Sequence, residues 1–244
     1  MSRLAYVTGG MGGIGTAICR RLHDSGYTVV AGCGPTRDHA KWLAEQAAAG
    51  YTFQVSVGNV ADWVSTCEAF DAVKAKHGVV DILVNNAGIT RDNLFRKMGP
   101  EDWRAVIDTN LNSVFNVTKQ VIEGMLDRGW GRIVNISSVN GEKGQFGQSN
   151  YSAAKAGMHG FTMALAQEVA AKGVTVNTVS PGYIATDMVL AVRDDVREKI
   201  IQQIPVKRLG RAEEIASIVN WLVSEDAAFT TGADFPVNGG LHMG

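Results

Sequence analysis

Short apolar runs alternate with longer amphipathic segments along all 244 residues, and this alternation limits the folds that the chain can adopt. Strands that alternate with helices form a parallel sheet whose two faces are both covered by helices. We therefore expect an α/β fold with a doubly wound parallel β-sheet. The expected strands are 4–7, 28–31, 52–57, 81–84, 133–136, 174–179 and 233–237.

Helical segments fill the intervals between these strands. The first helix ends at Gly26, and Asp62 has the position and the side chain of an N-cap. No linker and no internal repeat interrupts the pattern, so the sequence predicts a single domain, 1–244. The other expected helices are 38–49, 62–77, 101–125, 151–171 and 212–223.

A glycine-rich stretch from Thr8 to Gly15 separates the first strand from the first helix. Residues without side chains let the backbone approach a pyrophosphate, and a helix N-terminus offers free N–H groups and a positive dipole. The stretch therefore predicts a dinucleotide-binding turn; the alternative is a tight turn that needs positive φ angles. The GxGxxG pattern fits Gly10, Gly12 and Gly15, and TGxxxGxG fits Thr8, Gly9, Gly13 and Gly15.

The second strand ends without the acidic residue that an NAD site places about 20 residues beyond the glycines, where it holds the ribose 2′-hydroxyl. Small residues stand there instead, and Arg37 follows them. They leave room for a 2′-phosphate and the guanidinium supplies a positive charge, so the sequence favours NADP(H) as the cofactor. The alternative is that Arg37 is a solvated residue that opens the next helix.

Tyr151 and Lys155 stand four residues apart near the start of a predicted helix, so their side chains share one helix face. A nearby ammonium favours the phenolate and lowers the pKa of a tyrosine from about 10 toward neutrality. With a hydroxyl from the end of the 133–136 strand, the pair predicts a general acid for the reduction of a carbonyl group. A solvated surface pair is the alternative, and the short motif alone favours it.

Two further features concern the surroundings of a site. Asn110 lies within the apolar side of the 101–125 helix, where an unpaired amide is costly. Residues 181–210 contain two prolines and an amphipathic stretch over 194–204, which is typical of a mobile lid. We therefore expect a substrate lid at about 183–210.

The composition argues against several classes of protein. The formal net charge is −1 with no basic block, so neither nucleic acid nor a membrane surface is an expected partner. No apolar run approaches the length of about 18 residues that spans a bilayer. The three cysteines lack CxxC spacing and the five histidines lack metal-ligand spacing, so we expect reduced thiols, no metal and a cytoplasmic protein.

In combination, these motifs resemble those of the classical short-chain dehydrogenase/reductases over essentially the whole chain. TGxxxGxG over 8–15, NNAG over 85–88, a serine 13 residues before YxxxK, and a Pro-Gly pair at 181–182 occur in the order typical of that family. The resemblance implies a Rossmann-like fold and an oxidoreductase that uses a nicotinamide dinucleotide.

The resemblance also implies a role for each of four residues. Tyr151 is the general acid, and Lys155 lowers its pKa and binds the nicotinamide ribose. Ser138 polarises the substrate carbonyl, with Ser137 as its structural neighbour, and Asn110 anchors a proton-relay water.

By the same resemblance, the cofactor lies along residues from several loops. At the adenine contact, this chain has Asn59 where the family commonly has Asp. The implied contacts are Gly9, Gly13, Ile14, Gly15, Asn59, Val60, Asn86, Ala87, Gly88, Tyr151, Lys155, Pro181, Gly182 and Ile184, with Arg37 added for the 2′-phosphate.

Within the family, four segments resemble the acetoacetyl-CoA reductases of polyhydroxybutyrate synthesis: AYVTGGMGGIGTAIC, GITRDNLFRKM, VNGEKGQFGQSNYSAAKAG and NGGLHMG. This implies NADPH-dependent reduction of acetoacetyl-CoA, or another short 3-oxoacyl-CoA, to the (R)-3-hydroxyacyl-CoA in the cytoplasm. It also implies a homotetramer whose subunits pair through the 101–125 and 151–171 helices. Two alternatives remain: a 3-oxoacyl-[acyl carrier protein] reductase with the same catalytic residues, and a dinucleotide-binding sensor without catalysis.

The loop 144–148 borders the predicted carbonyl pocket because it lies between the catalytic serine and tyrosine. Gln145 and Gln148 carry amides that can donate to a thioester or pantetheine carbonyl. Phe146 can cover the acyl chain, and Tyr183 can close the opposite wall; the alternative is an ordinary polar loop. Basic residues near the mouth of the pocket could bind either the phosphates of CoA or an acidic carrier protein. They are Arg91, Arg96, Lys97, Arg128 and Lys172.

Overall fold

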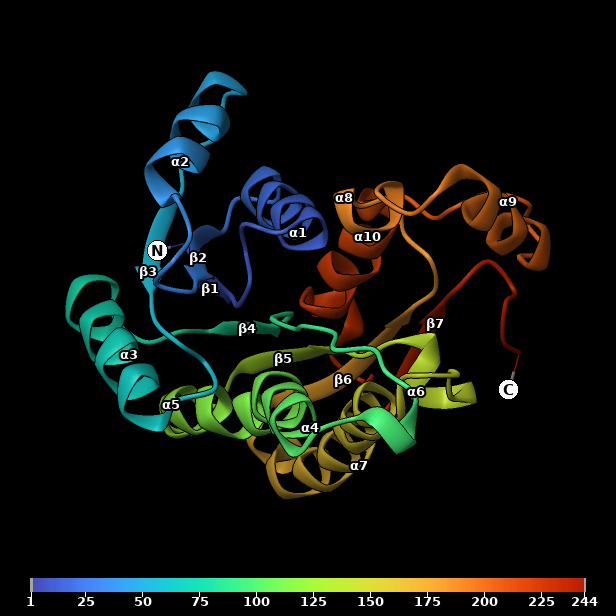
Figure 1. Ribbon diagram of the computed structural model, residues 1–244. Coiled ribbons are helices and arrows are strands. Elements are labelled where there is room, and N and C mark those ends of the chain that lie inside the picture. The colour runs from blue at the N-terminus through green and yellow to red at the C-terminus, as the bar shows by residue number, and fades with distance from the viewer. Residues whose placement is uncertain (1, 244) are drawn as a thin grey trace.

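Seven parallel strands form one central sheet in residues 2–243, the part of the chain that the computed structural model describes (Figure 1). The strand order is β3-β2-β1-β4-β5-β6-β7, and every neighbouring pair is parallel. The predicted doubly wound parallel sheet is therefore confirmed. The strands are β1 (Leu4–Val7), β2 (Thr28–Cys33), β3 (Gln54–Val57), β4 (Ile82–Asn85), β5 (Gly131–Ile136), β6 (Val174–Pro181) and β7 (Asp234–Val237).

Helices cover both faces of this sheet (Figure 1). The α-helices are α1 (Gly13–Asp24), α2 (His39–Ala48), α3 (Trp63–His77), α4 (Pro100–Ile107), α5 (Ser113–Arg128), α6 (Val139–Lys143), α7 (Ser149–Val169), α8 (Asp187–Leu190), α9 (Asp194–Gln203) and α10 (Ala212–Leu222). A π-helical turn, η2 (Asp108–Asn112), joins α4 to α5, and short 3-10 turns occur at η1 (Phe95–Lys97), η3 (Ala170–Lys172) and η4 (Glu225–Ala227).

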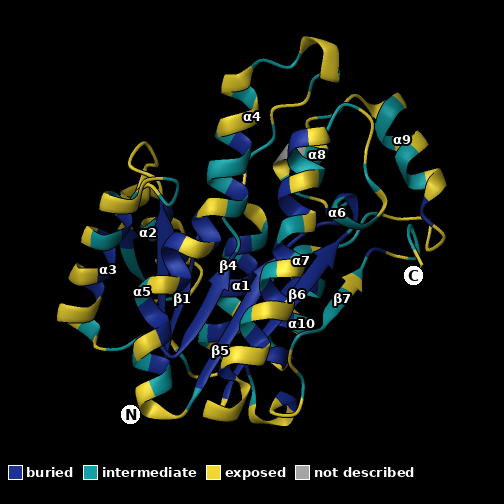
Figure 2. Ribbon diagram, turned by 90° about the horizontal axis from the view of Figure 1, so that it is seen from below, coloured by how far each residue is buried: buried dark blue, intermediate teal, exposed yellow. Residues whose placement is uncertain are grey.

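The core lies in two layers because side chains alternate between the faces of each strand. In β1, Ala5 and Val7 contribute to the layer covered by α1, α2 and α10, whereas Leu4 and Tyr6 contribute to the layer under α3, α5 and α7. All four are almost fully buried, as expected of a parallel strand between two helical layers (Figure 2). β1 therefore carries no polar outer face.

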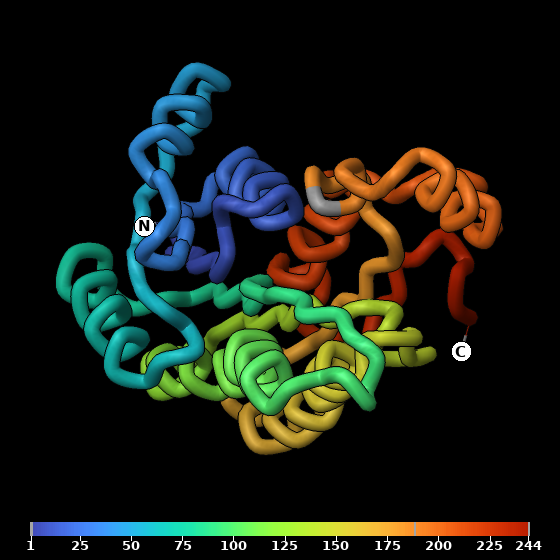
Figure 3. Tube along the Cα trace, viewed as in Figure 1, coloured from blue at the N-terminus to red at the C-terminus, as the bar shows by residue number. Residues whose placement is uncertain are grey.

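The order of the strands reverses between β1 and β4. From β1 the chain runs outward through β2 to β3, and then crosses to β4 on the other side of β1 (Figure 3). In sheets of this kind the crevice for a ligand opens at the carboxyl ends of the strands, at this reversal. The loops that follow β1, β2, β4, β5 and β6 all reach that edge.

The sequence placed every strand within two residues of its observed ends. Two helical predictions needed correction. The predicted 101–125 helix is interrupted by the π-helical turn η2, and the glycine-rich loop after β5 contains the short helix α6. Asp62 caps α3 as predicted, because its side chain accepts a hydrogen bond from the N–H of Ser65 at 2.7 Å.

The described residues also bear on the compositional expectations. Cys19, Cys33 and Cys67 are free thiols, and the first two are buried. Within residues 2–243, no group of three histidine, cysteine or acidic side chains is arranged to hold a metal ion. No helix in this part of the chain combines the length and the apolar character needed to cross a membrane.

Candidate active site

The glycine-rich turn places the N-terminus of α1 at the carboxyl edge of the sheet. Gly12 is the N-cap and has no capping side chain, so the first N–H groups of α1 have no side-chain partner. Gly9 adopts a φ of +61°, which favours glycine. A Cβ at Gly15 would collide with the carbonyl oxygen of Gly9 and lie 2.9 Å from the side-chain nitrogen of Asn86. The turn is thus a close-packed backbone cradle for an anion.

The Thr8 hydroxyl ties the glycine-rich turn to the loop after β4. It accepts hydrogen bonds from the N–H groups of Asn86 at 2.8 Å and of Ala87 at 3.0 Å. In return, the Asn86 amide donates to the carbonyls of Thr8 and Gly9 at 3.0 and 3.1 Å. The sequence assigned no role to this hydroxyl, although Thr8 opens the TGxxxGxG motif. These bonds fix two predicted cofactor loops relative to each other.

A cleft of about 400 Å³ runs along this cradle, and we call it the glycine-loop cleft. Arg37 lines it, together with Cys33 and Gly34 at the end of β2. It therefore combines a helix N-terminus for a diphosphate with a guanidinium near the end of the second strand, which fits a nicotinamide dinucleotide. The other lining residues are Gly9, Met11, Gly12, Gly13, Ile14, Gly15, Asn86, Ala87, Gly88, Thr186 and Asp187.

A second cavity, of about 200 Å³, holds three of the four predicted catalytic residues, and we call it the reaction cavity. Ser138, Tyr151 and Lys155 all line it. It shares Ile14, Asn86, Gly88 and Thr186 with the glycine-loop cleft, so the two are continuous. It is also lined by Ile89, Thr90, Ile136, Ser137, Pro181, Gly182, Ile184 and Val189. Among all its lining residues, the sequence did not single out Ile89, Thr90, Ile136, Thr186 and Val189 as site residues.

Tyr151 is half-buried, and its phenol lies beside the hydroxyl of Ser138. Burial raises the pKa of Tyr151, the hydrogen bond with Ser138 opposes that rise, and the charge of Asp92 adds to it. The sequence predicted the opposite direction, a pKa lowered by Lys155. That prediction is wrong, because burial disfavours the phenolate more than its neighbours stabilise it.

Lys155 is 3% exposed, so its ammonium is as costly to bury as the phenolate. Burial lowers the pKa of Lys155 to about 7. Its Nζ donates to the carbonyl of Ile136 at 2.7 Å and lies 5.6 Å from the centroid of the Tyr151 ring. The solvated-pair alternative for Tyr151 and Lys155 is therefore excluded.

The two serines after β5 have different partners. The Ser137 hydroxyl donates to the carbonyl of Lys155 at 2.9 Å and lies 2.9 Å from the Nε2 of His159. Ser138 is the N-cap of α6, where its hydroxyl accepts from the N–H of Asn140 at 3.1 Å and also meets the Tyr151 phenol. Ser138 is therefore the serine that faces the reacting groups.

Asn110 lies in the π-helical turn η2 and is fully buried. Its amide nitrogen donates to the carbonyls of Ile89 at 2.9 Å and Val106 at 2.8 Å, and its amide oxygen accepts from the N–H of Ile89 at 3.2 Å. Both amide hydrogens of Asn110 are thus hydrogen-bonded, so its burial leaves no amide hydrogen unpaired. A Cβ at Gly88 would lie 2.5 Å from this oxygen and 3.6 Å from the Nζ of Lys155, so Asn110 lies beside the reaction cavity. π-Helical turns are frequent at functional sites.

The predicted lid region rises from the end of β6. Its base is closed because the N–H of Ala185 donates to the carbonyl of Gly210 at 2.8 Å, and the N–H of Gly210 donates to the carbonyl of Tyr183 at 2.9 Å. Between these ends stand α8 and α9. Near the base, Arg208 donates to both carboxylate oxygens of Glu214, at 2.8 and 2.6 Å.

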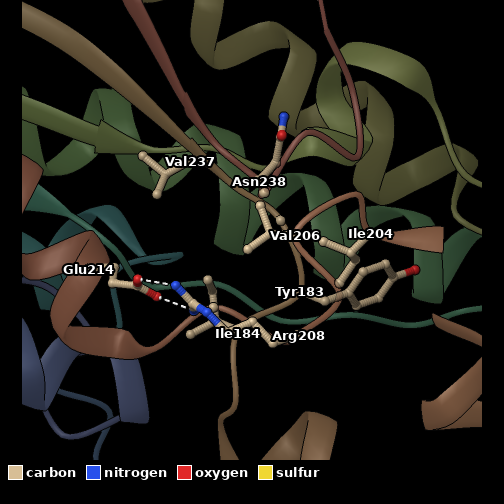
Figure 4. A pocket seen from close by; sticks show the side chains of 11 residues that line it. Tyr183, Ile184, Ile204, Val206, Arg208, Glu214, Val237 and Asn238 are labelled. Carbon is tan, nitrogen blue, oxygen red and sulfur yellow. Dashed lines mark hydrogen bonds and ion pairs between the residues drawn. The ribbon is translucent and has the colours of Figure 1, made fainter. Parts of the chain in front are cut away.

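Tyr183 lines a small pocket beneath the lid rather than the reaction cavity. Figure 4 shows its ring on one side of this pocket and the Arg208–Glu214 pair on the other. Burial raises the pKa of the Tyr183 phenol, and the charge of Asp92 adds to the rise. Asp92 therefore lies near both Tyr183 and Tyr151.

The loop after α6 presents its predicted substrate residues outside the reaction cavity. The amide of Gln148 is engaged at both atoms, since it donates to Asp92 at 2.8 Å and accepts from Asn140 at 3.0 Å. Gln145 accepts from the ammonium of Lys143 at 3.0 Å, and Phe146 is 85% exposed. Their predicted contacts with substrate stay predictions.

Asn59 and Val60, which follow β3, do not line the glycine-loop cleft. The side chain of Asn59 accepts from the N–H of Ala61 at 3.2 Å, and the carbonyl of Val60 accepts from Asn116 at 3.0 Å. Both residues stand at the carboxyl edge of the sheet, next to the strand that ends at the cleft. Their contact with a cofactor also stays a prediction.

Comparison with known proteins gives a consistent result. Residues 3–197 match the family model described as short chain dehydrogenase. The chain is 73% identical to an acetoacetyl-CoA reductase of Cupriavidus necator over 99% of both chains. It is 56% identical to an acetoacetyl-CoA reductase of Allochromatium vinosum over 100% of both. It is 46% identical to a 3-oxoacyl-[acyl-carrier-protein] reductase of Escherichia coli over 99% of this chain and 98% of that protein.

Proposed function

The chain belongs to the short-chain dehydrogenase family, and from this membership we propose that it is an NADPH-dependent acetoacetyl-CoA reductase of polyhydroxybutyrate biosynthesis. Its product is the (R)-3-hydroxyacyl-CoA. One observation carries the proposal: Ser138, Tyr151 and Lys155 converge in a reaction cavity that continues into the glycine-loop cleft. Steady-state turnover of acetoacetyl-CoA, with NADPH and NADH in parallel, tests it and separates an enzyme from a non-catalytic sensor.

The three converging residues suit the reduction of a carbonyl group. A bound nicotinamide dinucleotide supplies the hydride for the 3-oxo carbon. Tyr151 donates its phenolic proton to the carbonyl oxygen, because a phenol whose pKa is raised by burial is held protonated until the oxygen acquires charge. Ser138 donates a hydrogen bond to the same oxygen and so polarises the carbonyl.

Lys155 is the source of positive charge beside the phenol. In the reacting complex its ammonium stabilises the phenolate that Tyr151 becomes, and it binds the nicotinamide ribose. Asn110 holds the Ile89 loop against the cavity and anchors a water in the proton-relay path to Lys155. The role of Asn110 is supported by its position across Gly88 from the Lys155 ammonium.

We further propose that NADPH is preferred over NADH, because Arg37 lines the glycine-loop cleft where the ribose 2′-phosphate would bind. A guanidinium–phosphate contact is charge-assisted, so its loss is expected to cost roughly 1.5–3 kcal/mol. Arg37→Ala should therefore raise the KM for NADPH about tenfold or more, and the KM for NADH by less than about twofold. Arg21→Ala, at an exposed position on α1, is the control. Equal effects on the two cofactors would make Arg37 a structural residue.

The carrier of the acyl group is proposed to be CoA rather than an acyl carrier protein. The support is that two relatives at 73% and 56% identity are acetoacetyl-CoA reductases, whereas the carrier-protein reductase is 46% identical. The kcat/KM for acetoacetyl-CoA should therefore exceed that for acetoacetyl carrier protein in one enzyme preparation. A value tenfold higher for the carrier protein, about 1.4 kcal/mol of transition-state binding, would favour the alternative.

We propose that the substrate residues meet the acyl chain when the lid segment, about 183–210, closes. Tyr183 lines the pocket beneath the lid, and the loop with Gln145, Phe146 and Gln148 follows α6, the helix that Ser138 caps. The exposed Phe146 ring would gain burial against an acyl chain, and apolar burial is favourable. The amides would exchange their present partners for the thioester or pantetheine carbonyl.

We propose that the protein is a homotetramer in the cytoplasm. The support for assembly is a groove of about 390 Å³ between α5 and α7, which leaves Phe115 55% exposed. The three free cysteines suit a reducing compartment. The apolar residues of the groove are Phe115, Ile122, Leu126, Phe161, Ala164, Leu165 and Val169.

A further inference from the structure

Four polar side chains lie together behind the reaction cavity, contributed by the end of β5, α6, α7 and β7. The Nε2 of His159 lies 2.9 Å from the Ser137 hydroxyl, and its Nδ1 lies 3.9 Å from Asp234. The carboxyl group of Glu142 lies against the carboxyl group of Asp234. Asp234 also accepts from the Ser180 hydroxyl at 2.9 Å. The proposed function gives none of these side chains a role.

The contact between Glu142 and Asp234 requires a proton. The Oε2 atom of Glu142 is buried and has no hydrogen-bond donor among the described residues. Two carboxylates are both acceptors, so they can share a hydrogen bond only if one of them is protonated. Burial and the neighbouring Asp234 together raise the pKa of Glu142 to about 8. The pair therefore holds one proton at neutral pH.

The cluster reaches the backbone of the catalytic lysine in two ways. The Ser137 hydroxyl donates its hydrogen to the carbonyl of Lys155 at 2.9 Å, so the bond between Ser137 and His159 is donated by the imidazole Nε2. In addition, a Cβ at Gly141 would lie 2.9 Å from the carbonyl carbon and the Cβ of Lys155. Helix α6 is therefore pressed directly against α7 at the residue that carries the ammonium.

We propose that Glu142, Asp234, His159 and Ser137 form a proton-sharing brace that positions Lys155 for the reaction. We call this set the carboxyl brace. The shared proton holds α6 to β7, and α6 in turn keeps α7 and the Lys155 backbone in register with the end of β5. The role in catalysis rests on the proposed reductase function.

The brace has a built-in response to pH. The titratable groups that face Glu142 are Asp234 on β7 and, beyond it, His159 on α7. On α6 itself, the ammonium of Lys143 donates to the carbonyl of Gly144 and to Gln145 instead. When Glu142 ionises, two carboxylates face each other at close range without a donor between them. Their repulsion would move α6 away from β7 and release Lys155.

Two variants of Glu142 test the brace. Glu142→Ala removes the donor to Asp234, so kcat for acetoacetyl-CoA reduction should fall about threefold or more at pH 7, with KM changed less than about twofold. Glu142→Gln keeps a neutral donor of similar shape and should recover most of that loss. Because glutamine cannot ionise, the ratio of kcat at pH 9 to kcat at pH 7 should be about threefold or more higher in Glu142→Gln than in the wild type.

Melting temperatures measured at several pH values test for the shared proton without any assay of turnover. The Glu142 carboxyl titrates near pH 8 in the folded protein and near about 4.3 in the unfolded chain. Its stabilising contribution is thus fully present below about pH 4.3 and is lost as pH rises through 8. The melting temperature of Glu142→Gln minus that of the wild type should therefore increase as pH rises from 5 to 9. Glu45→Gln, an exposed glutamate on α2, is the control and should match the wild type.

Two results would overturn the brace. One is superimposable kcat and melting profiles for the wild type and Glu142→Gln across this pH range. The other is a Glu142→Ala variant that melts earlier but keeps its kcat, which would leave a merely structural contact. If the wild type itself turned over no 3-oxoacyl thioester, the proposed function would fail, and the melting comparison would still decide whether the carboxyls share a proton.

Discussion

Tyr151→Phe is expected to lower kcat for acetoacetyl-CoA reduction by about a hundredfold or more, the usual scale for the loss of a general acid. The substitution keeps the half-buried ring and removes only the hydroxyl that meets Ser138. Packing around the ring is therefore retained, and the lost atom is the proposed proton donor. Stopped-flow or steady-state oxidation of NADPH at 340 nm measures the change.

Binding of NADPH by this variant, followed by fluorescence titration, should stay within about twofold of the wild type, because the glycine-loop cleft is untouched. Tyr51→Phe removes a phenol from an aromatic cluster against α1 and should leave kcat unchanged. A Tyr151→Phe enzyme that kept half of the wild-type kcat would remove Tyr151 from the role of general acid.

Lys155→Met is the second large effect that we expect. The methionine side chain fills a similar volume but has no charge and cannot donate to the carbonyl of Ile136, which Lys155 Nζ reaches at 2.7 Å. Without the ammonium the phenolate of Tyr151 loses its stabilising neighbour, so kcat should again fall by about a hundredfold or more. Lys74→Met, on the exposed side of α3, is the matched control. A Lys155→Met enzyme with near-normal kcat would show that Tyr151 works without the ammonium.

The same variant should change how stability depends on pH. Burial lowers the pKa of Lys155 to about 7, whereas an unfolded lysine titrates near about 10.4. Between these values unfolding takes up a proton, so the wild type gains stability as pH rises, by up to about 1.4 kcal/mol per pH unit, and loses that gain as pH falls through 7. The stability advantage of Lys155→Met should therefore be largest below pH 7 and shrink toward pH 10. Denaturant unfolding at several pH values measures it.

The sequence predicted the sheet well because the strands are short apolar runs bounded by glycine, asparagine and serine, which are local signals. The choice of Ser138 over Ser137 came from the family resemblance, and Ser138 is the serine whose hydroxyl meets the Tyr151 phenol. Helix α6 was missed because Val139–Lys143 includes a glycine and has little intrinsic preference for a helix. It forms where Ser138 caps it and Gly141 packs against the backbone of Lys155.

Contacts between distant parts of the chain set the properties that the sequence did not predict. The pKa of Tyr151 is raised chiefly by burial, which depends on how elements distant in the sequence pack around the phenol. The amide of Gln148 is occupied by Asp92, which lies 56 positions earlier in the chain. No residue within the loop 144–148 indicates that Asp92 is the partner of Gln148. Local patterns thus identified the candidate catalytic residues, whereas the direction of the pKa shift of Tyr151 depends on tertiary packing.

The closed base of the lid segment has a consequence for the diversity of substrates. Because residues 183–185 are hydrogen-bonded to Gly210, the intervening chain leaves the sheet and returns to it at one fixed point. Changes of sequence confined to α9, none of whose residues is buried, need not disturb β6, α10 or the catalytic cluster. Helix α9 is therefore a replaceable module, through which related enzymes or designed variants can acquire a different acyl-chain preference while the reducing machinery stays the same.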